Sequence, residues 1–242
     1  MDITYCVIMI LACTGASFVQ RVSGFGFGIF IMTMLPFILP SYGEATTLSG
    51  ILSATQCIWV LLRVYKHISW RRLLPIMLAF LIVSYFAVGY VATAGDALIK
   101  HIFGATLIAL SIYFFVFSER ISVRPSMPIQ LSMGALSGIM GGLFAMQGPP
   151  AVLYFVASER EKEAYLAMTQ AYFFIGNVAM TFYRAHNGFF TTDVAWGWLY
   201  ALPGVFIGTW LGRLVFDRVS APLLRRIIYA YMAVSGVMAL LS

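Results

Sequence analysis

Long apolar runs separated by short polar connections dominate this sequence of 242 residues. A helix needs about 20 consecutive apolar residues to cross a lipid bilayer. Runs that approach this length predict membrane-spanning helices at residues 44–62, 73–93, 98–117, 163–183, 194–214 and 223–241. The pattern therefore predicts an all-α integral membrane protein.

Two further apolar stretches are each interrupted by a glycine-rich break, which reads QRVSGFGFG at 20–28 and FAMQGPP at 144–150. The apolar arms lie at 3–19 and 26–39 around the first break, and at 129–143 and 150–157 around the second. An unpaired backbone group costs several kcal/mol in a bilayer, so a break is stable there only where protein or a water-filled cavity satisfies it. Paired breaks in matching halves are typical of a transporter's binding site.

The two halves agree in order, which predicts an internal duplication of one membrane domain into residues 1–122 and 123–242. Glu44 and Glu163 each open the segment that follows a broken pair. The Lys100-His101 pair of the first half is matched by two arginines at 225–226 in the second. Chance similarity between two apolar sequences is the alternative explanation.

Basic residues predict the orientation, because short cytoplasmic loops are enriched in lysine and arginine. They gather in two connections, at positions 63–72 and 213–226. If both connections are cytoplasmic, the broken pair at 129–157 must enter and leave the membrane on one side. Each half is then a re-entrant or broken helix pair plus three transmembrane helices. The halves form inverted-topology repeats, both termini lie outside, and the two breaks meet near the midplane.

The breaks predict a site for a small anion. Unpaired amides at the start of each half-helix attract negative charge, and Arg21 would add a permanent cation. Arg21 could instead extend to the lipid headgroups, Ser23 could simply cap a helix, and the polar residues on the long helices could join helices. The candidate substrate-binding residues are Gln20, Arg21, Ser23, Gly24, Phe25, Gly26, Gln147, Gly148, Pro149, Gln56, Gln170 and Asn177.

Composition narrows the class of function. Apolar residues make up 61% of the chain and charged residues 10%, with a mean hydropathy of +0.90, which excludes a soluble domain. The net charge of +6 lies at helix ends, which indicates topology and not nucleic-acid binding. The sequence has no H-E-x-x-H motif or paired aspartates, and its three cysteines lack metal-ligand spacing. We expect no enzymatic activity, no cofactor and no metal ion.

Several of these motifs resemble the TauE/SafE sulfite-exporter family. They are the runs 15–36 and 134–155, the HISWRR elbow at 67–72 and the Gly208-x-x-x-Gly212-Arg213 segment. The resemblance covers essentially the whole chain and implies transport of sulfite, sulfoacetate or a related organosulfonate across a bacterial inner membrane. The family often has consecutive glycines where this chain reads GFGFG, and a glycine pair where it has Gly148-Pro149-Pro150.

Taken together, these patterns favour export by alternating access, with the anion held at the midplane by half-helix N-termini and Arg21. An inside-negative potential favours expulsion of an anion by about 2.3 kcal/mol per unit charge per 100 mV. The alternative is an anion channel for small oxyanions or carboxylates, and a membrane subunit without transport is a third reading. The expected partners are the anion and the lipid bilayer. The coupling ion and the oligomeric state are open, with a homodimer as one candidate.

Overall fold

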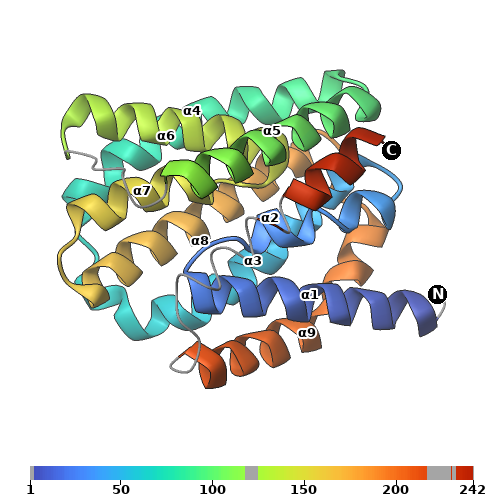
Figure 1. The fold of residues 1–242 in the computed structure, drawn as a ribbon, viewed down its shortest axis with the longest axis horizontal. Helices are drawn as coiled ribbons and strands as arrows, with labels where there is room; N and C mark the ends of the chain where they lie inside the picture. Colours follow the sequence, from blue (N-terminus) through green and yellow to red (C-terminus); the bar gives the residue numbers. More distant parts are fainter. Residues whose placement is uncertain (1–2, 118–124, 217–229, 231–232, 242) are drawn as a thin grey trace.

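The computed structural model describes residues 3–117, 125–216, 230 and 233–241, and the regular secondary structure of this part of the chain is all helical (Figure 1). Its α-helices are α1 (Ile3–Ser23), α2 (Phe27–Ile31), α3 (Tyr42–Val64), α4 (Trp70–Thr93), α5 (Asp96–Phe117), α6 (Met127–Phe144), α7 (Gly148–Ser158), α8 (Lys162–His186) and α9 (Thr192–Phe216). Two short 3-10 helices, η1 (Leu35–Phe37) and η2 (Tyr65–His67), and a helical stretch at 233–241 complete the described structure.

Among the described residues, six helices are long and apolar enough to cross a membrane: Ile3–Val22, Tyr42–His67, Trp70–Thr93, Asp96–Tyr113, Met127–Phe144 and Thr192–Leu214. The predicted spans at 44–62, 73–93, 98–117 and 194–214 are among them. The predicted span at 163–183 forms α8, which is 25 residues long but is not in this apolar set. Most of the predicted span at 223–241 lies outside the described residues, as does the proposed boundary between the halves.

The first broken segment differs from its prediction. We expected an arm at 3–19 and a second arm at 26–39, but α1 continues to Ser23 and the second arm divides into α2 and η1. α2 ends after five residues. Pro36 lies near the start of η1. Because proline lacks an N–H, it cannot extend a regular helix from the preceding turn. The second broken segment follows its prediction more closely, with α6 and α7 on either side of the break.

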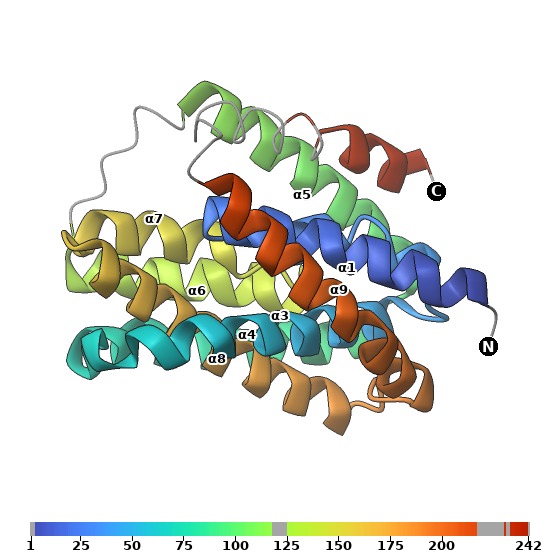
Figure 2. The ribbon, with the colours of Figure 1, turned by 90° about the horizontal axis from the view of Figure 1, so that it is seen from below.

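Glycine ridges hold two pairs of helices in close contact, as their four-residue spacing predicts. On α6, a Cβ added at Gly138 would lie 2.9 Å from the backbone oxygen of Phe80 on α4. On α9, a Cβ added at Gly208 would lie 2.7 Å from Cβ of Ser17 on α1. Gly134 and Gly142 on the first ridge, and Gly204 and Gly212 on the second, meet the preceding and following turns of the partner helix in the same chain direction. Figures 1 and 2 accordingly show α1 beside α9, and α6 beside α4, with parallel chain directions.

The long helices α3 and α8 pack against each other between these two pairs, and α3 also contacts α9 while α8 contacts α4 (Figure 1). One apolar core cluster includes parts of α1, α2, α3 and α9, and a second includes parts of α4, α7 and α8. Phe25, in the first break, packs against both clusters. The break therefore lies where the two halves of the core meet.

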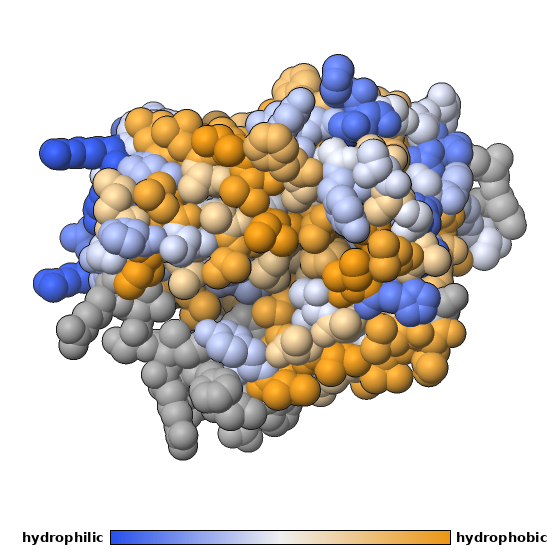
Figure 3. Space-filling view, turned by 90° about the horizontal axis from the view of Figure 1, so that it is seen from above, coloured by the Kyte–Doolittle hydropathy of each residue, from blue (hydrophilic) through white to orange (hydrophobic). Residues whose placement is uncertain are grey.

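Charged connections gather at one end of the molecule. Arg72 Nη1 lies 3.0 Å from Glu159 Oε2, and His67 Nε2 lies 3.7 Å from Glu163 Oε2. These contacts place the α3–α4 connection beside the α7–α8 connection. Figure 3 shows long hydrophilic side chains projecting from one end of the long axis, further hydrophilic residues toward the other end, and hydrophobic residues over the middle of this face.

Candidate functional site

The two breaks are made by residues in the left-handed backbone region. Gly24 and Gly26 have φ values of +82° and +104°, a conformation that glycine adopts without steric cost. In the second break the left-handed residue is Ala145, with φ +56°. Its N–H donates to Gly141 O at 2.9 Å, which closes the end of α6 before the chain turns into α7.

The breaks lie directly against each other, which the sequence predicted from their matching positions. A Cβ added at Gly28 would overlap the carbonyl oxygen of Ala145. Reciprocally, a Cβ added at Gly148 would lie 3.3 Å from Cβ of Phe25. Gly28 thus lets the backbone of the second break approach, and Gly148 leaves room for the side chain of Phe25 in the first. Segments more than a hundred residues apart in sequence form one structural unit.

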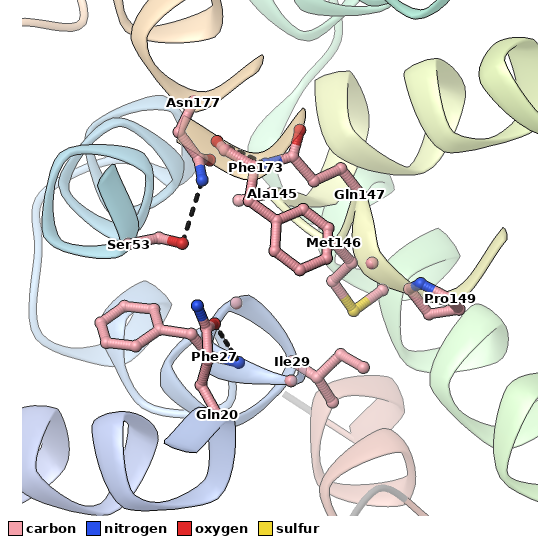
Figure 4. A pocket seen from close by; sticks show the side chains of 13 residues that line it. Gln20, Phe27, Ile29, Ser53, Ala145, Met146, Gln147, Pro149, Phe173 and Asn177 are labelled. Carbon is pink, nitrogen blue, oxygen red and sulfur yellow. Dashed lines mark hydrogen bonds between the residues drawn. The ribbon is translucent and has the colours of Figure 1, made fainter. Parts of the chain in front are cut away.

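A small cavity of about 20 Å³, lined mostly by buried residues, lies between the breaks (Figure 4). Its lining includes six of the predicted site residues, namely Gln20, Gly26, Gln147, Gly148, Pro149 and Asn177. The remaining lining residues are Phe27, Gly28, Ile29, Ser53, Ala145, Met146 and Phe173. A cavity of this size holds about one water molecule.

Three carboxamide side chains provide most of the polarity of this cavity. Asn177 Nδ2 donates to Ser53 Oγ at 3.0 Å and joins α8 to α3 (Figure 4). Gln147 Nε2 donates to the carbonyl of Phe173 at 3.2 Å, and Gln20 Oε1 accepts from the amide of Phe27 at 3.3 Å. No acidic or basic side chain is among the described residues that line the cavity. The walls can therefore donate hydrogen bonds to an anion without holding it by a direct ion pair.

Arg184, on α8, is a buried cation that the sequence reading missed. Its side chain is 1% exposed. Nη1 donates to Thr46 O at 2.9 Å, and Nη2 donates to Gly141 O at 2.8 Å and to Gly142 O at 3.3 Å. The guanidinium thus binds the C-terminal carbonyls of α6, just before the second break, and links them to α3. Its position in the last turn of a long apolar run made it resemble an ordinary helix-end residue.

Arg184 and the cavity share one face of α8. Asn177 and Arg184 are seven residues apart, which is two helical turns or about 10 Å along the axis. A Cβ added at Gly50 on α3 would lie 3.3 Å from Arg184 Nη1 and 3.8 Å from Asn177 Oδ1. The absence of a side chain at Gly50 therefore brings α3 against the segment of α8 that connects the cation to the cavity.

Comparison with known proteins decides the family. The model of the family described as Sulfite exporter TauE/SafE matches residues 9–239. The chain belongs to this family. It is 20% identical over 201 residues to the "Probable sulfite/organosulfonate exporter TauE" of Cupriavidus necator, a match that covers 81% of this chain and 78% of that protein. No solved structure gives a significant match. As a TauE/SafE protein, the chain is a multi-pass membrane protein of a transporter family, and not an enzyme.

Arg21 of this TauE/SafE protein does not line the cavity between the breaks. Because α1 remains helical to Ser23, Arg21 lies in its last turn and packs against α9, where a Cβ added at Gly212 would lie 2.7 Å from Cβ of Arg21. Arg21 instead lines a separate cavity of about 330 Å³ together with Arg63 and Arg213. Arg21, the predicted cation of the site, therefore lies apart from the cavity between the breaks.

Other predicted residues lie near the breaks or away from them. Gly24 and Phe25 belong to the first break but do not line the cavity, and the side chain of Ser23 lies outside the described structure. Gln56 Nε2 donates to Ser17 O at 2.9 Å and to Thr209 Oγ1 at 3.4 Å, so it joins α3 to α1 and α9. Gln170 is buried on α8, away from the cavity lining.

The half-helices contribute fewer amides than expected. α2 has only five residues, and the amide of its first residue, Phe27, is already bonded to Gln20. α7 has 11 residues and begins with Gly148, followed by two prolines that have no N–H to donate. The side-chain carboxamides consequently carry more of the predicted donor role. Within the described structure, no group of three or more His, Cys, Asp or Glu residues is placed to hold a metal ion.

Proposed function

We propose that this protein exports sulfite or a related organosulfonate, such as sulfoacetate, through the cavity between its two breaks. The observation that carries the proposal is the contact of Gly28 with Ala145, which brings both breaks around one small, carboxamide-lined cavity. The exporter name of the Cupriavidus necator relative supports the substrate class.

The chemistry of the cavity suits transient binding of an oxyanion. Neutral donors from Gln20, Gln147 and Asn177 satisfy anion oxygens, and they release them more easily than a contacting arginine would. Arg184 adds a positive potential from within about 10 Å, since its Nη1 and Asn177 Oδ1 both lie within 4 Å of the position that a Cβ at Gly50 would take. At an effective dielectric constant of about 20, a unit charge within that distance attracts an anion by at least about 1.5 kcal/mol. This attraction corresponds to roughly a tenfold gain in affinity.

The size of the cavity supports alternating access over a channel. A volume of about 20 Å³ accommodates about one water molecule, whereas sulfite has four heavy atoms. The walls must therefore move apart to admit substrate, and we propose that the α1–α9 and α4–α6 pairs move relative to each other. A channel would need a continuous pore through this site.

The contacts between helices support the inverted-repeat arrangement. If α1 to α5 correspond in order to α6 to α9 and the stretch at 233–241, the α1–α9 pair is equivalent to the α6–α4 pair. The α3–α9 contact is likewise equivalent to the α8–α4 contact, and α3 and α8 exchange with each other. We propose that two inverted halves, meeting at 118–124, move around the fixed central site.

The distribution of charge supports an orientation in the bacterial inner membrane. Arg63, Arg71, Arg72 and Arg160 lie in or beside the connections that the ion pairs of Arg72 and His67 bring together. We propose that this basic end is cytoplasmic, with both termini outside. The membrane potential would then drive an anion outward.

Counterflow in proteoliposomes tests this function. Vesicles loaded with unlabelled sulfite should accumulate radiolabelled sulfite transiently, because a carrier with alternating access exchanges one substrate for another. Sulfoacetate inside the vesicles should also drive accumulation if organosulfonates are substrates. Linear, non-saturating flux without counterflow would indicate a channel, and the absence of any flux would refute transport of these anions.

A further inference from the structure

The cavity of about 330 Å³ that contains Arg21 lies at the ends of three helices, apart from the cavity between the breaks. Its three arginines each occupy the last turn of a helix, with Arg21 on α1, Arg63 on α3 and Arg213 on α9. These positions bring three arginines to one cavity at the basic end of the molecule. Three cations around one cavity are suited to an anionic group with several oxygens.

The rest of the wall of this cavity is mostly aromatic and apolar. Trp59 and Phe206 pack edge to face, with ring centroids 5.7 Å apart, and Trp210 lines the same cavity. These three side chains are 51%, 48% and 61% exposed, and they lie on apolar helices that are candidate membrane spans. The aromatic wall therefore faces the bilayer. Tryptophan in this position, beside basic residues, is typical of the membrane–water interface.

We infer that this cavity binds an anionic phospholipid, with its phosphate among Arg21, Arg63 and Arg213 and an acyl chain along the Trp59, Phe206 and Trp210 wall. The charge of the arginines is complementary to a phosphodiester, and the exposed aromatic wall is complementary to a hydrocarbon chain. A free inorganic anion would satisfy the arginines but would leave this wall unused. Basic pockets between transmembrane helices on the cytoplasmic side bind anionic headgroups in this way.

The position of the lipid bears on the proposed movement. The cavity is bounded by α1, α3, α8 and α9, so a bound lipid would contact both members of the α1–α9 pair and both central helices. A phospholipid here would stabilise one arrangement of these helices relative to the other. The inference itself does not depend on which anion the protein transports.

Lipid binding can be measured by native mass spectrometry of delipidated protein titrated with phosphatidylglycerol or phosphatidylcholine. We expect tight binding of one phosphatidylglycerol and weak binding of phosphatidylcholine. The Arg63→Gln/Arg213→Gln variant should bind phosphatidylglycerol about 25-fold more weakly, since each basic residue contributes about 1 kcal/mol, or about fivefold. The matched control, Arg71→Gln/Arg160→Gln, removes two exposed cations outside the cavity and should bind like the wild type.

Quenching of tryptophan fluorescence gives a second measurement that does not depend on the arginine variants. Brominated phosphatidylglycerol should quench the wild type more strongly than brominated phosphatidylcholine, and Trp59→Phe/Trp210→Phe should remove the difference. Equal binding of both lipids, or equal loss in both arginine variants, would overturn the inference. Displacement of phosphatidylglycerol by millimolar sulfite would overturn the preference for a lipid over a free anion and would identify the cavity as an entrance for substrate.

Discussion

Gly28 packs against the carbonyl oxygen of Ala145 so closely that any side chain at Gly28 would overlap it. One residue belongs to the short helix after the first break, and the other is the left-handed residue that ends α6. This contact joins the two breaks into one unit around the small cavity between them. A substitution in either break should therefore also affect the structure of the other.

Substitution of Gly28 by alanine tests this contact. The added methyl group meets backbone and not a flexible side chain, so we expect a loss of about 1 to 3 kcal/mol in stability and at least a tenfold loss of transport. Gly89→Ala on α4 is the matched control, because a Cβ there meets no atom within 4 Å. Thermal unfolding and sulfite flux should separate the two variants, and equal behaviour would contradict the close packing.

Gln20 and Gln56 both bond to other parts of the structure, but only Gln20 also lines the cavity. Gln20 lines the cavity, so Gln20→Ala should raise the KM for sulfite by about tenfold, as expected for the loss of about 1.4 kcal/mol. Gln56 bonds to Ser17 and Thr209 on neighbouring helices, so Gln56→Ala should lower stability by about 1 kcal/mol and leave KM unchanged. The reverse pattern would exchange their roles.

Arg184 should contribute to both stability and affinity. Arg184→Ala leaves the carbonyls of Thr46 and Gly141 buried without this donor, which should cost about 3 kcal/mol or more. Loss of the cation should also raise the KM for sulfite about tenfold. Arg184→Lys keeps the charge but not the forked geometry, so we expect it to restore affinity more than thermal stability. An alanine variant with wild-type KM would show that the cation does not act on the substrate.

Glu159 should make stability depend on pH. Burial raises the pKa of this carboxyl above its ordinary value of 4.5, and Arg72 opposes the shift. The folded protein then binds the proton more tightly than the unfolded chain. The unfolding free energy should therefore fall as the pH rises from the ordinary pKa of the carboxyl through its raised pKa in the folded protein. Melting temperatures measured from about pH 4 to pH 8 should show this slope in the wild type but not in Glu159→Gln. The exposed variant Glu161→Gln should retain the slope.

The general architecture could be predicted from the sequence because membrane helices have a strong compositional signal. The breaks and their meeting point followed from glycine, proline and backbone hydrogen bonding, which are local properties. The end of α1 could not be predicted from the sequence, because Ser23 and the residues before it are compatible with either a helix or a loop. That difference of one helical turn determines where Arg21 lies.

The position of Arg184 could not be predicted, for a related reason. A basic residue at the end of an apolar run normally reaches the lipid headgroups. Here the carbonyls at the C-terminus of α6 provide acceptors inside the protein, and this depends on how α6, α3 and α8 pack. Ser53, on α3, was also missed, since its role in the cavity comes from its hydrogen bond to Asn177 on α8.

The central claim is that a sulfur oxyanion passes through the cavity between the breaks. Its most direct test is sulfite counterflow with Asn177→Asp, which places a negative charge in that cavity, beside Asn187→Asp, which places the same charge at an exposed helix end. We predict loss of counterflow in the first variant and wild-type counterflow in the second. Wild-type counterflow in a folded Asn177→Asp variant would contradict the claim that the anion occupies this cavity.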